Sequence, residues 1–293
     1  MNTALLSQFK AMLNQGLQDD GWELDWTTLG TLKNSDQKSS AKIVAKSDGV
    51  WVGEELCHAL QMLSQELGSS VQTKCMKKNG DRIKKGETVC QWSGSTRAML
   101  ALERPFLNIA SYLGGIALQT RKLVDQVDRS WKKKSAPKPR VTSTRKTLPE
   151  YRDLAVHAVM AGGGFSHRVS LSGGVLIKEN HIAAAGSISR ALEGVRAVAP
   201  HGLKLEIEVR SQDELNQALE AGADVVMLDN FTPKQVLQSL KILKTKSPKT
   251  VVEVSGGLNE KNIASYALEG VSILSVGSLT HSVQAIDLSL LFS

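Results

Sequence analysis

Residues 203–257 have the clearest strand–helix rhythm of the chain, with the sequence LKLEIEVRSQDELNQALEAGADVVMLDNFTPKQVLQSLKILKTKSPKTVVEVSGG. Apolar and polar residues alternate over residues 203–209, which is the two-residue period of a β-strand. Val225–Leu228 and Val251–Val254 are short apolar runs typical of buried strands. Between the strands stand a capping box at residues 211–214 and an N-cap with proline at residues 232–233. This alternation predicts a parallel sheet covered by helices.

The same rhythm extends on both sides of this stretch. The six predicted strands are Arg140–Thr144, Val175–Ile177, residues 203–209, Val225–Leu228, Val251–Val254 and Val271–Val276. Polar residues or glycines follow every one of them. An open doubly wound sheet concentrates its site at one switch point, whereas a barrel builds its site from the loops after all its strands. The fold class is therefore predicted as α/β, an incomplete α/β barrel of about six strand–helix units.

The first part of the chain has a different pattern. Residues 1–70 show helical periodicity around a short extended segment, Lys42–Ala45, and two further helical patterns cover Arg97–Leu107 and Ile116–Val127. A helix is also expected from Asn259 through Leu268. We predict an N-terminal α/β (α+β) domain over residues 1–116 and a barrel catalytic domain over residues 117–281. The C-terminal tail, residues 282–293, is expected to pack back on the N-terminal domain.

The charge of the chain is concentrated in one segment. The 36 Lys and Arg residues exceed the 29 Asp and Glu residues by 7. Eight of these cations, with no acid among them, lie within residues 129–149: Arg129, Lys132, Lys133, Lys134, Lys138, Arg140, Arg145 and Lys146. Without them the balance is 28 − 29 = −1. Only Trp131 provides an aromatic ring there, which disfavours a nucleic-acid binder.

Composition also excludes several other classes. Three cysteines without a CxxC pair argue against a disulfide framework and favour a reducing compartment. The uncharged stretch Pro105–Thr120 is shorter than the ~20 apolar residues of a membrane span, and we find no secretory signal. We therefore expect a cytoplasmic protein with no membrane or nucleic-acid partner. A biotinyl or lipoyl carrier is disfavoured because Ser93–Arg97 contains no lysine.

Several candidate site residues follow the predicted strands. Arg145, Lys146 and Lys178 are cations at strand ends, where a small polyanion would offset their repulsion. Glycine loops follow the last two strands, and such loops can hold a phosphate with backbone N–H groups. Glu208 and Asp229 are carboxylates at the ends of neighbouring strands. The residues alone leave open whether these carboxylates pair with cations, hold ribose hydroxyls, bind a metal or face a developing positive charge.

Seven fragments carry a resemblance to a known family when taken in order. They are Thr144–Thr147, Gly162–Arg168, Ile177–Ile182, Leu205–Val209, Met227–Asn230, Glu253–Gly257 and Ser275–Ser282. This set resembles the quinolinate phosphoribosyltransferase family, the carboxylating nicotinate-nucleotide pyrophosphorylases of NAD biosynthesis. The similarity is densest over residues 103–287. His181, within the third fragment, is a candidate to orient Lys178 or Glu179.

The resemblance implies a pentosyltransferase that joins quinolinate to phosphoribosyl pyrophosphate with Mg²⁺, releasing pyrophosphate and CO2. It implies a homodimer, or a larger assembly of dimers, with a site shared between subunits. The quinolinate-binding residues would be Arg104 from the neighbouring subunit, Thr144, Arg145, Lys146, His167, Arg168 and Lys178. The phosphoribosyl pyrophosphate-binding residues would be Glu208, Asp229, Ser255, Gly256, Gly257, Gly277, Ser278, Leu279 and His281. Lys146, Lys178, Glu208 and Asp229 would be catalytic.

Glu208 and Asp229 would also hold Mg²⁺, directly or indirectly. Two alternatives stay open at this point. One is a paralogue linked to molybdenum transport, which shares part of the pattern. The other is a phosphoribosyltransferase that acts on a different nitrogen heterocycle. The run Ile177–Ile182 favours the quinolinate enzyme over the paralogue.

Overall fold

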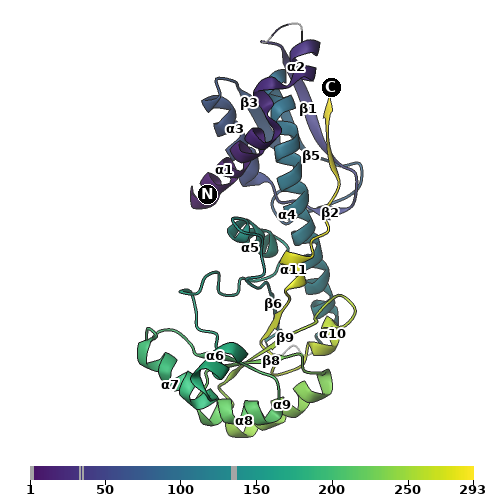
Figure 1. The fold of residues 1–293 in the computed structure, drawn as a ribbon. Coiled ribbons are helices and arrows are strands. Elements are labelled where there is room, and N and C mark those ends of the chain that lie inside the picture. The colour runs from purple at the N-terminus through teal and green to yellow at the C-terminus, as the bar shows by residue number, and fades with distance from the viewer. Residues whose placement is uncertain (1–2, 33, 35, 133–136) are drawn as a thin grey trace. The chain divides into compact units, whose positions relative to one another are not determined.

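The computed structural model describes residues 3–32, 34, 36–132 and 137–293 (Figure 1). Lys133 and Lys134 of the basic segment lie outside these described residues. The chain forms two compact units. The first contains residues 1–119, 153–163 and 283–293, and the second contains residues 120–152 and 164–282. Of the helices in the described ranges, none is long and apolar enough to cross a membrane.

The first unit is built on an antiparallel sheet with the strand order β11-β1-β5-β3. These strands are β1 (Lys38–Ala45), β3 (Val71–Cys75), β5 (Thr88–Ser95) and β11 (Leu288–Phe292), and a small pair joins β2 (Gly49–Val50) to β4 (Arg82–Ile83). The helices are α1 (Thr3–Asp20), α2 (Trp26–Thr31), α3 (Glu54–Glu66) and α5 (Arg152–Ala161), with a 3-10 turn at Trp22–Leu24. Phe9, Leu13 and Leu17 form one buried face of α1, as the spacing of an amphipathic helix requires.

The long helix α4 (Thr96–Ser130) is continuous where the sequence predicted two helices. Ile109, Ala110 and Leu113 lie between the two predicted segments and are buried, so the apolar helical spacing does not stop at Leu107. Gly114 and Gly115 stand within the helix for a steric reason. A Cβ atom at Gly115 would lie 2.2 Å from the carbonyl oxygen of Gln284. The two glycines therefore let the C-terminal tail pass close to the helix before β11 pairs with β1.

The second unit contains a parallel sheet, five-stranded in the described residues, with the order β6-β10-β9-β8-β7. Its strands are β6 (Arg140–Thr142), β7 (Glu206–Val209), β8 (Val225–Asp229), β9 (Val251–Ser255) and β10 (Ile273–Ser275). Its helices are α6 (Glu179–Ala185), α7 (Ile188–Val198), α8 (Gln212–Glu220), α9 (Pro233–Lys246), α10 (Ile263–Tyr266) and α11 (Ser278–His281). The parallel α/β class predicted from the sequence is confirmed.

Two predicted elements of this unit are shorter than expected. Val175–Ile177 forms only a single parallel bridge, between Ile177 and Ile207, in place of a sixth strand. The helix predicted from Asn259 begins at Ile263. The side chain of Asn262 accepts a hydrogen bond from the backbone N–H of Asn259 at 2.8 Å. This local side-chain bond competes with helix formation, because it offers the backbone another partner.

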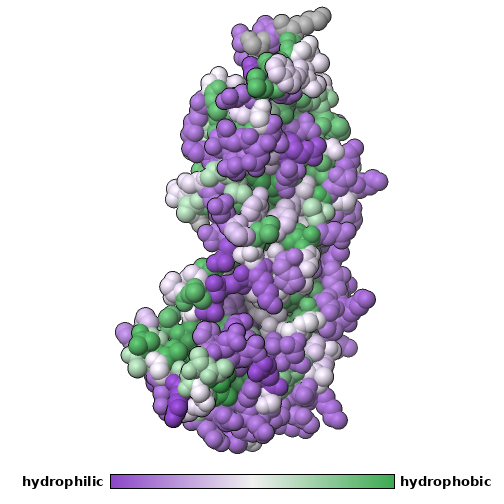
Figure 2. All heavy atoms as spheres, in the orientation of Figure 1, coloured by the Kyte–Doolittle hydropathy of each residue, from purple (hydrophilic) through white to green (hydrophobic). Residues whose placement is uncertain are grey.

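The exterior of the second unit is mostly hydrophilic on the face shown in Figure 2, with hydrophobic side chains at the surface beside α6 and α7. The strands beneath present one apolar face. Val226, Leu228 and Val254 are all buried. This is the face of a parallel sheet that helices cover. The other face of the strands carries Glu206, Glu208 and Glu253, so polar side chains gather there and in the loops that follow the strands.

We expect Gly115→Ala to destabilise the first unit, because the added methyl group would overlap the Gln284 carbonyl. Overpacking of this kind costs about 1–3 kcal/mol. Gly30→Ala in α2 is the matched control, since a Cβ there meets nothing within 4 Å. Thermal unfolding checks both variants. A Gly115→Ala protein as stable as the Gly30→Ala protein would contradict the close approach of the tail.

Candidate active site

A cavity of about 690 Å³ opens in the second unit where the parallel strands end. Most of the sequence-predicted residues line it: Thr144, Arg145, Lys146, His167, Arg168, Lys178, Glu208, Asp229, Ser255, Gly256, Gly257, Gly277, Ser278 and His281. Leu279 is fully buried in α11. Arg104 lies on α4 in the first unit, and its role stays a prediction. The cavity also contacts residues that the sequence analysis did not assign, namely Leu176, Met227, Asn230, Glu253, Leu258, Asn259 and Ser275.

One part of the cavity carries guanidinium groups that lack protein partners at one nitrogen. The Nε atoms of Arg145 and Arg168 are buried, and neither has a hydrogen-bond partner within the described part of the chain. Burial, and then repulsion from Arg145, lower the pKa of Arg168. Two repelling guanidinium groups with unsatisfied donors favour an anionic ligand, and carboxylates match guanidinium geometry best.

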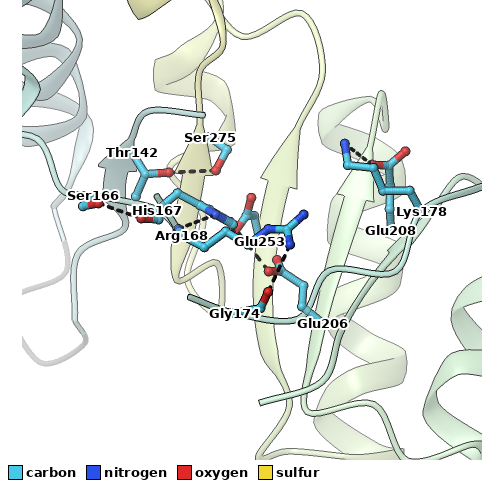
Figure 3. Close-up of polar contacts among 10 residues, drawn as sticks. All are labelled: Thr142, Ser166, His167, Arg168, Gly174, Lys178, Glu206, Glu208, Glu253 and Ser275. Carbon is cyan, nitrogen blue, oxygen red and sulfur yellow. Dashed lines mark hydrogen bonds and ion pairs between the residues drawn. The ribbon is translucent and has the colours of Figure 1, made fainter. Parts of the chain in front are cut away.

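Lys178 lines the cavity beside Glu208 (Figure 3). Its Nζ lies 3.2 Å from Oε2 of Glu208, whose side chain is only 12% exposed. The backbone N–H of Lys178 donates to Nδ1 of His181 at 2.9 Å, which fixes the backbone of Lys178; that His181 orients the lysine side chain stays a prediction. The lysine is therefore held at the start of α6 while its side chain stays half-exposed, so that its ammonium group remains available to a ligand.

His167 is held by the protein at both ring nitrogens (Figure 3). The backbone N–H of Arg168 donates to Nδ1 of His167 at 2.8 Å. Because Nδ1 accepts, the proton of the neutral ring is on Nε2, which lies 3.2 Å from Oε2 of Glu253 and 3.6 Å from Oε2 of Glu206. His167 therefore links the backbone of Arg168 to two buried carboxyl groups. In this geometry its ring supports Arg168 and has no nitrogen left for a ligand.

Glu206 and Glu253 form a buried carboxyl pair beneath His167 (Figure 3). Glu253 is fully buried and Glu206 is 7% exposed. Burial, and next the charge of Glu253, raise the pKa of Glu206 to about 9. Glu206 is therefore protonated at neutral pH, since two adjacent buried carboxylates cannot both be charged.

Sequence reasoning missed these two acids, although a signal for each was present. Glu206 precedes Glu208 by two residues, so strand alternation places both side chains on the same face. Glu253 is a charged residue within an otherwise apolar strand, where a carboxyl group is rare without a partner. That partner, His167, comes from a distant loop.

Another part of the cavity is formed by acidic and glycine residues at the ends of β8 and β9. Asn230 Nδ2 donates to Oδ2 of Asp229 at 2.7 Å, and the Asn230 backbone N–H donates to the Ser255 carbonyl at 2.9 Å. Gly256 has a φ of 92°, and a Cβ there would lie 2.3 Å from Oδ1 of Asn230. Only glycine fits this position. The residue keeps the loop after β9 close to Asp229.

Free donors face the cavity near these loops. Among the described residues, the backbone N–H groups of Gly256 and Gly257 make no hydrogen bond, and the buried Oγ of Ser278 has no partner. Gly277 lies between two of the predicted side chains, because a Cβ there would be 3.3 Å from both Lys146 Cδ and His281 Nε2. Thr280 Oγ1 donates to the Lys146 carbonyl at 2.8 Å and fixes this loop against α11. Such a set of donors suits a phosphate.

Comparison with known proteins agrees with this geometry. Residues 25–113 match the family model described as quinolinate phosphoribosyl transferase, N-terminal domain, and residues 116–291 match the C-terminal domain of the same family. The nicotinate-nucleotide pyrophosphorylase [carboxylating] of Mycobacterium leprae is 35% identical over 274 residues, covering 93% of both chains. That of Dictyostelium discoideum is 34% identical and covers 98% of this chain and 97% of its own.

Solved structures show the same similarity. The nicotinate-nucleotide pyrophosphorylase of Ehrlichia chaffeensis superposes with a TM-score of 0.86 at 30% identity, covering 100% of this chain and 99% of that chain. The corresponding protein of Francisella tularensis has a TM-score of 0.85 at 30% identity, covering 98% and 97%. Both the fold and the order of the two parts of the chain are therefore shared with these proteins.

We predict that Glu206→Gln stabilises the protein more as the pH rises. The pKa of Glu206 is raised on folding, so the unfolded chain loses a proton that the folded chain keeps between about pH 4.5 and pH 9. Over that window the parent loses up to about 1.4 kcal/mol of stability per pH unit. Glutamine, a neutral replacement, removes this loss.

Thermal unfolding at pH 5 to pH 8, with a metal chelator present, measures the effect. Glu220→Gln, at an exposed position at the end of α8, is the control. A stability difference between Glu206→Gln and the parent that stays constant with pH would contradict a protonated Glu206.

Proposed function

The chain belongs to the quinolinate phosphoribosyl transferase family, and we propose how its cavity divides between the two substrates. It is a carboxylating nicotinate-nucleotide pyrophosphorylase, a pentosyltransferase of NAD biosynthesis. It transfers the phosphoribosyl group of phosphoribosyl pyrophosphate to quinolinate, giving nicotinate mononucleotide, pyrophosphate and CO2. One observation carries the proposed division: unpartnered guanidinium donors and unpartnered loop donors lie in one cavity, with Lys178 and the carboxylates among its lining residues.

Quinolinate is assigned to the cationic part. Its two adjacent carboxylates would accept hydrogen bonds from Arg145 and Arg168, whose Nε groups are unsatisfied within the described residues. Lys178 would leave Glu208 to contact the dicarboxylate, and Thr144 and Lys146 would line the same part. His167 contributes by holding Arg168 in place through Glu253. A substrate with one carboxylate would leave part of this charge unpaired, which favours a dicarboxylate.

Phosphoribosyl pyrophosphate is assigned to the loops after β8, β9 and β10. The amides of Gly256 and Gly257 and the Ser278 hydroxyl would hold phosphate oxygens, with Ser255 and His281 beside them. Lys146 lies near Gly277, so its ammonium group can reach the pyrophosphate as well as the dicarboxylate. Leu279 anchors this loop through its buried side chain.

Mg²⁺ fits the acidic residues of this part. Glu208 and Asp229 supply carboxylate oxygens, the ligand type that Mg²⁺ prefers, and Mg²⁺ commonly combines one or two carboxylates with substrate phosphates. Within the described residues, Asp229 accepts one side-chain hydrogen bond, from Asn230, which leaves carboxylate lone pairs available. The ion would neutralise charge on the departing pyrophosphate, either bound directly to these side chains or through water.

The chain's own residues act mainly by position and charge. Arg145, Arg168 and Lys178 would hold quinolinate so that its nitrogen faces the ribose, which converts a two-molecule reaction into a local one. Glu208 and Asp229 would stabilise the positive charge that develops on the ribose as pyrophosphate leaves. The pyridinium ring formed by transfer then stabilises the carbanion left by CO2 loss, and this carbon takes up a proton from water to give nicotinate mononucleotide. This sequence of steps needs no dedicated general base.

We further propose a cytoplasmic homodimer, or an assembly of dimers, in which the partner subunit's Arg104 completes the quinolinate site. Large hydrophobic side chains are exposed on loops of the second unit, with Phe165 at 45%, Leu171 at 70% and Leu148 at 53%. Burial of such side chains in a subunit interface would be favourable. The free thiols of all three cysteines are consistent with a reducing compartment.

We expect Arg145→Ala to weaken quinolinate binding by at least about 10-fold, because hydrogen bonds between charged groups contribute about 1.5–3 kcal/mol. Phosphoribosyl pyrophosphate binding in Mg²⁺ should change little. Glu208→Gln is the reciprocal variant and should weaken phosphoribosyl pyrophosphate binding more than quinolinate binding. Isothermal calorimetry measures all four affinities. Equal weakening of both ligands by Arg145→Ala would contradict the assignment.

The shared site predicts complementation between inactive variants. Arg104→Ala and Lys178→Ala should each be nearly inactive alone. If Arg104 acts across the interface, a mixed dimer carries one intact site. An equimolar mixture exchanged to equilibrium should then regain about one quarter of the parent's kcat per chain. A mixture of the Lys178→Ala and Arg145→Ala variants is the control. Both changed residues belong to the same subunit's part of the site, so no mixed dimer has an intact site and this pair should not complement. If the mixture of Arg104→Ala and Lys178→Ala regains no activity although mass spectrometry shows heterodimers, Arg104 does not act in the partner subunit's site.

A further inference from the structure

The three cysteines of the chain, distant in sequence, meet in the first unit. Cys57 lies on α3, Cys75 ends β3 and Cys90 lies on β5. Their Sγ atoms are all within 4.8 Å of one another, and those of Cys57 and Cys90 are 3.5 Å apart. None of them lines the catalytic cavity. The sequence predicted no cysteine cluster, because their spacing matches no metal-binding motif.

The register of the sheet forces two of these thiols together. Cys75 and Cys90 are directly opposite on antiparallel strands. The next pair along is hydrogen-bonded, since Met76 N–H donates to the Val89 carbonyl at 2.9 Å. Hydrogen-bonded and non-hydrogen-bonded pairs alternate, so Cys75 and Cys90 form a non-hydrogen-bonded pair, in which side chains are closer. Thr73 Oγ1 lies 3.5 Å from the Cys57 carbonyl and 2.9 Å from Gln61 Oε1, which brings α3 over this point.

We propose that Cys57, Cys75 and Cys90 bind one thiophilic metal ion, Zn²⁺ or Cu⁺, through three thiolates. A metal–sulfur distance of about 2.3 Å places three sulfur atoms of a trigonal site about 4 Å apart. The observed limit of 4.8 Å accommodates that triangle with small side-chain adjustments. Thiolates select soft ions over Mg²⁺ and Ca²⁺, so this site and the carboxylates of the catalytic cavity would take different metals.

Burial and access divide the roles of the three thiols. Cys57 and Cys90 are buried, whereas Cys75 is partly exposed and gives a metal ion access from solvent. A metal ion takes cysteine as the thiolate, so binding would displace the thiol protons.

Metal-free, reduced, full-length protein titrated with Zn²⁺ alone and with Cu⁺ alone, each against a competing chelator, tests this. We expect one equivalent of at least one ion per chain, with a sub-micromolar Kd. Loss of a second-shell partner costs 10–100-fold in affinity, so loss of a ligand in Cys75→Ser should cost at least about 100-fold. Lys74→Ser, adjacent on the same strand, should bind as the parent does. Quinolinate turnover, assayed with Mg²⁺ but without Zn²⁺ or Cu⁺, should be the same for Cys75→Ser and for the parent.

A second measurement does not depend on how the variant folds. The parent should react with a thiol-alkylating reagent at Cys75, and the bound metal should block that reaction, as intact mass shows. Saturable binding of either ion with this protection supports the proposal, and the ion that binds identifies the metal. Stoichiometric binding of neither ion, equal binding by Cys75→Ser, or unchanged alkylation would overturn it and leave the thiols as core packing.

Discussion

Parallel strands end at the same edge of their sheet, and the cavity of this protein depends on that rule. The loop after β6, the ends of β7 and β8 and the loops after β9 and β10 each deliver polar groups to this edge. No single loop contains the site. Lys178 reaches the same edge although its strand is reduced to one bridge, because Ile177 still aligns with Ile207. The chemistry of the enzyme follows from that convergence of opposite charges.

The convergence of cations has an electrostatic cost, and buried acids on the sheet offset it. Arg145 and Arg168 repel each other when no ligand is bound, as the lowered pKa of Arg168 indicates. The protonated Glu206 adjoins Glu253, and the two ring nitrogens of His167 link Glu253 to the backbone N–H of Arg168. A fully charged acid pair would cost more in such a buried place. Preorganised guanidinium groups supported in this way are an effective receptor for a dicarboxylate.

Sequence reasoning predicted the parallel strands and most residues that line the cavity, because strand ends and glycine turns leave local signals. Asp229 and Gly256 are examples, since both directly follow or end a buried strand. It failed where the determining contact is long-range. Glu253 depends on His167, and the cysteine cluster depends on sheet register and helix docking. The helix expected at Asn259 failed for a local reason, because the Asn262 side chain bonds the backbone there.

The central claim is that one cavity holds a pyridine dicarboxylate next to phosphoribosyl pyrophosphate and catalyses transfer with loss of CO2. The most direct measurement uses quinolinate labelled with ¹³C at the 2-carboxylate, with Mg²⁺ and phosphoribosyl pyrophosphate, and nicotinate in a parallel reaction. The account predicts labelled CO2 and nicotinate mononucleotide in equal amounts from quinolinate, and no comparable turnover of nicotinate. Equal turnover of the two, or no product from quinolinate with folded protein, would contradict it.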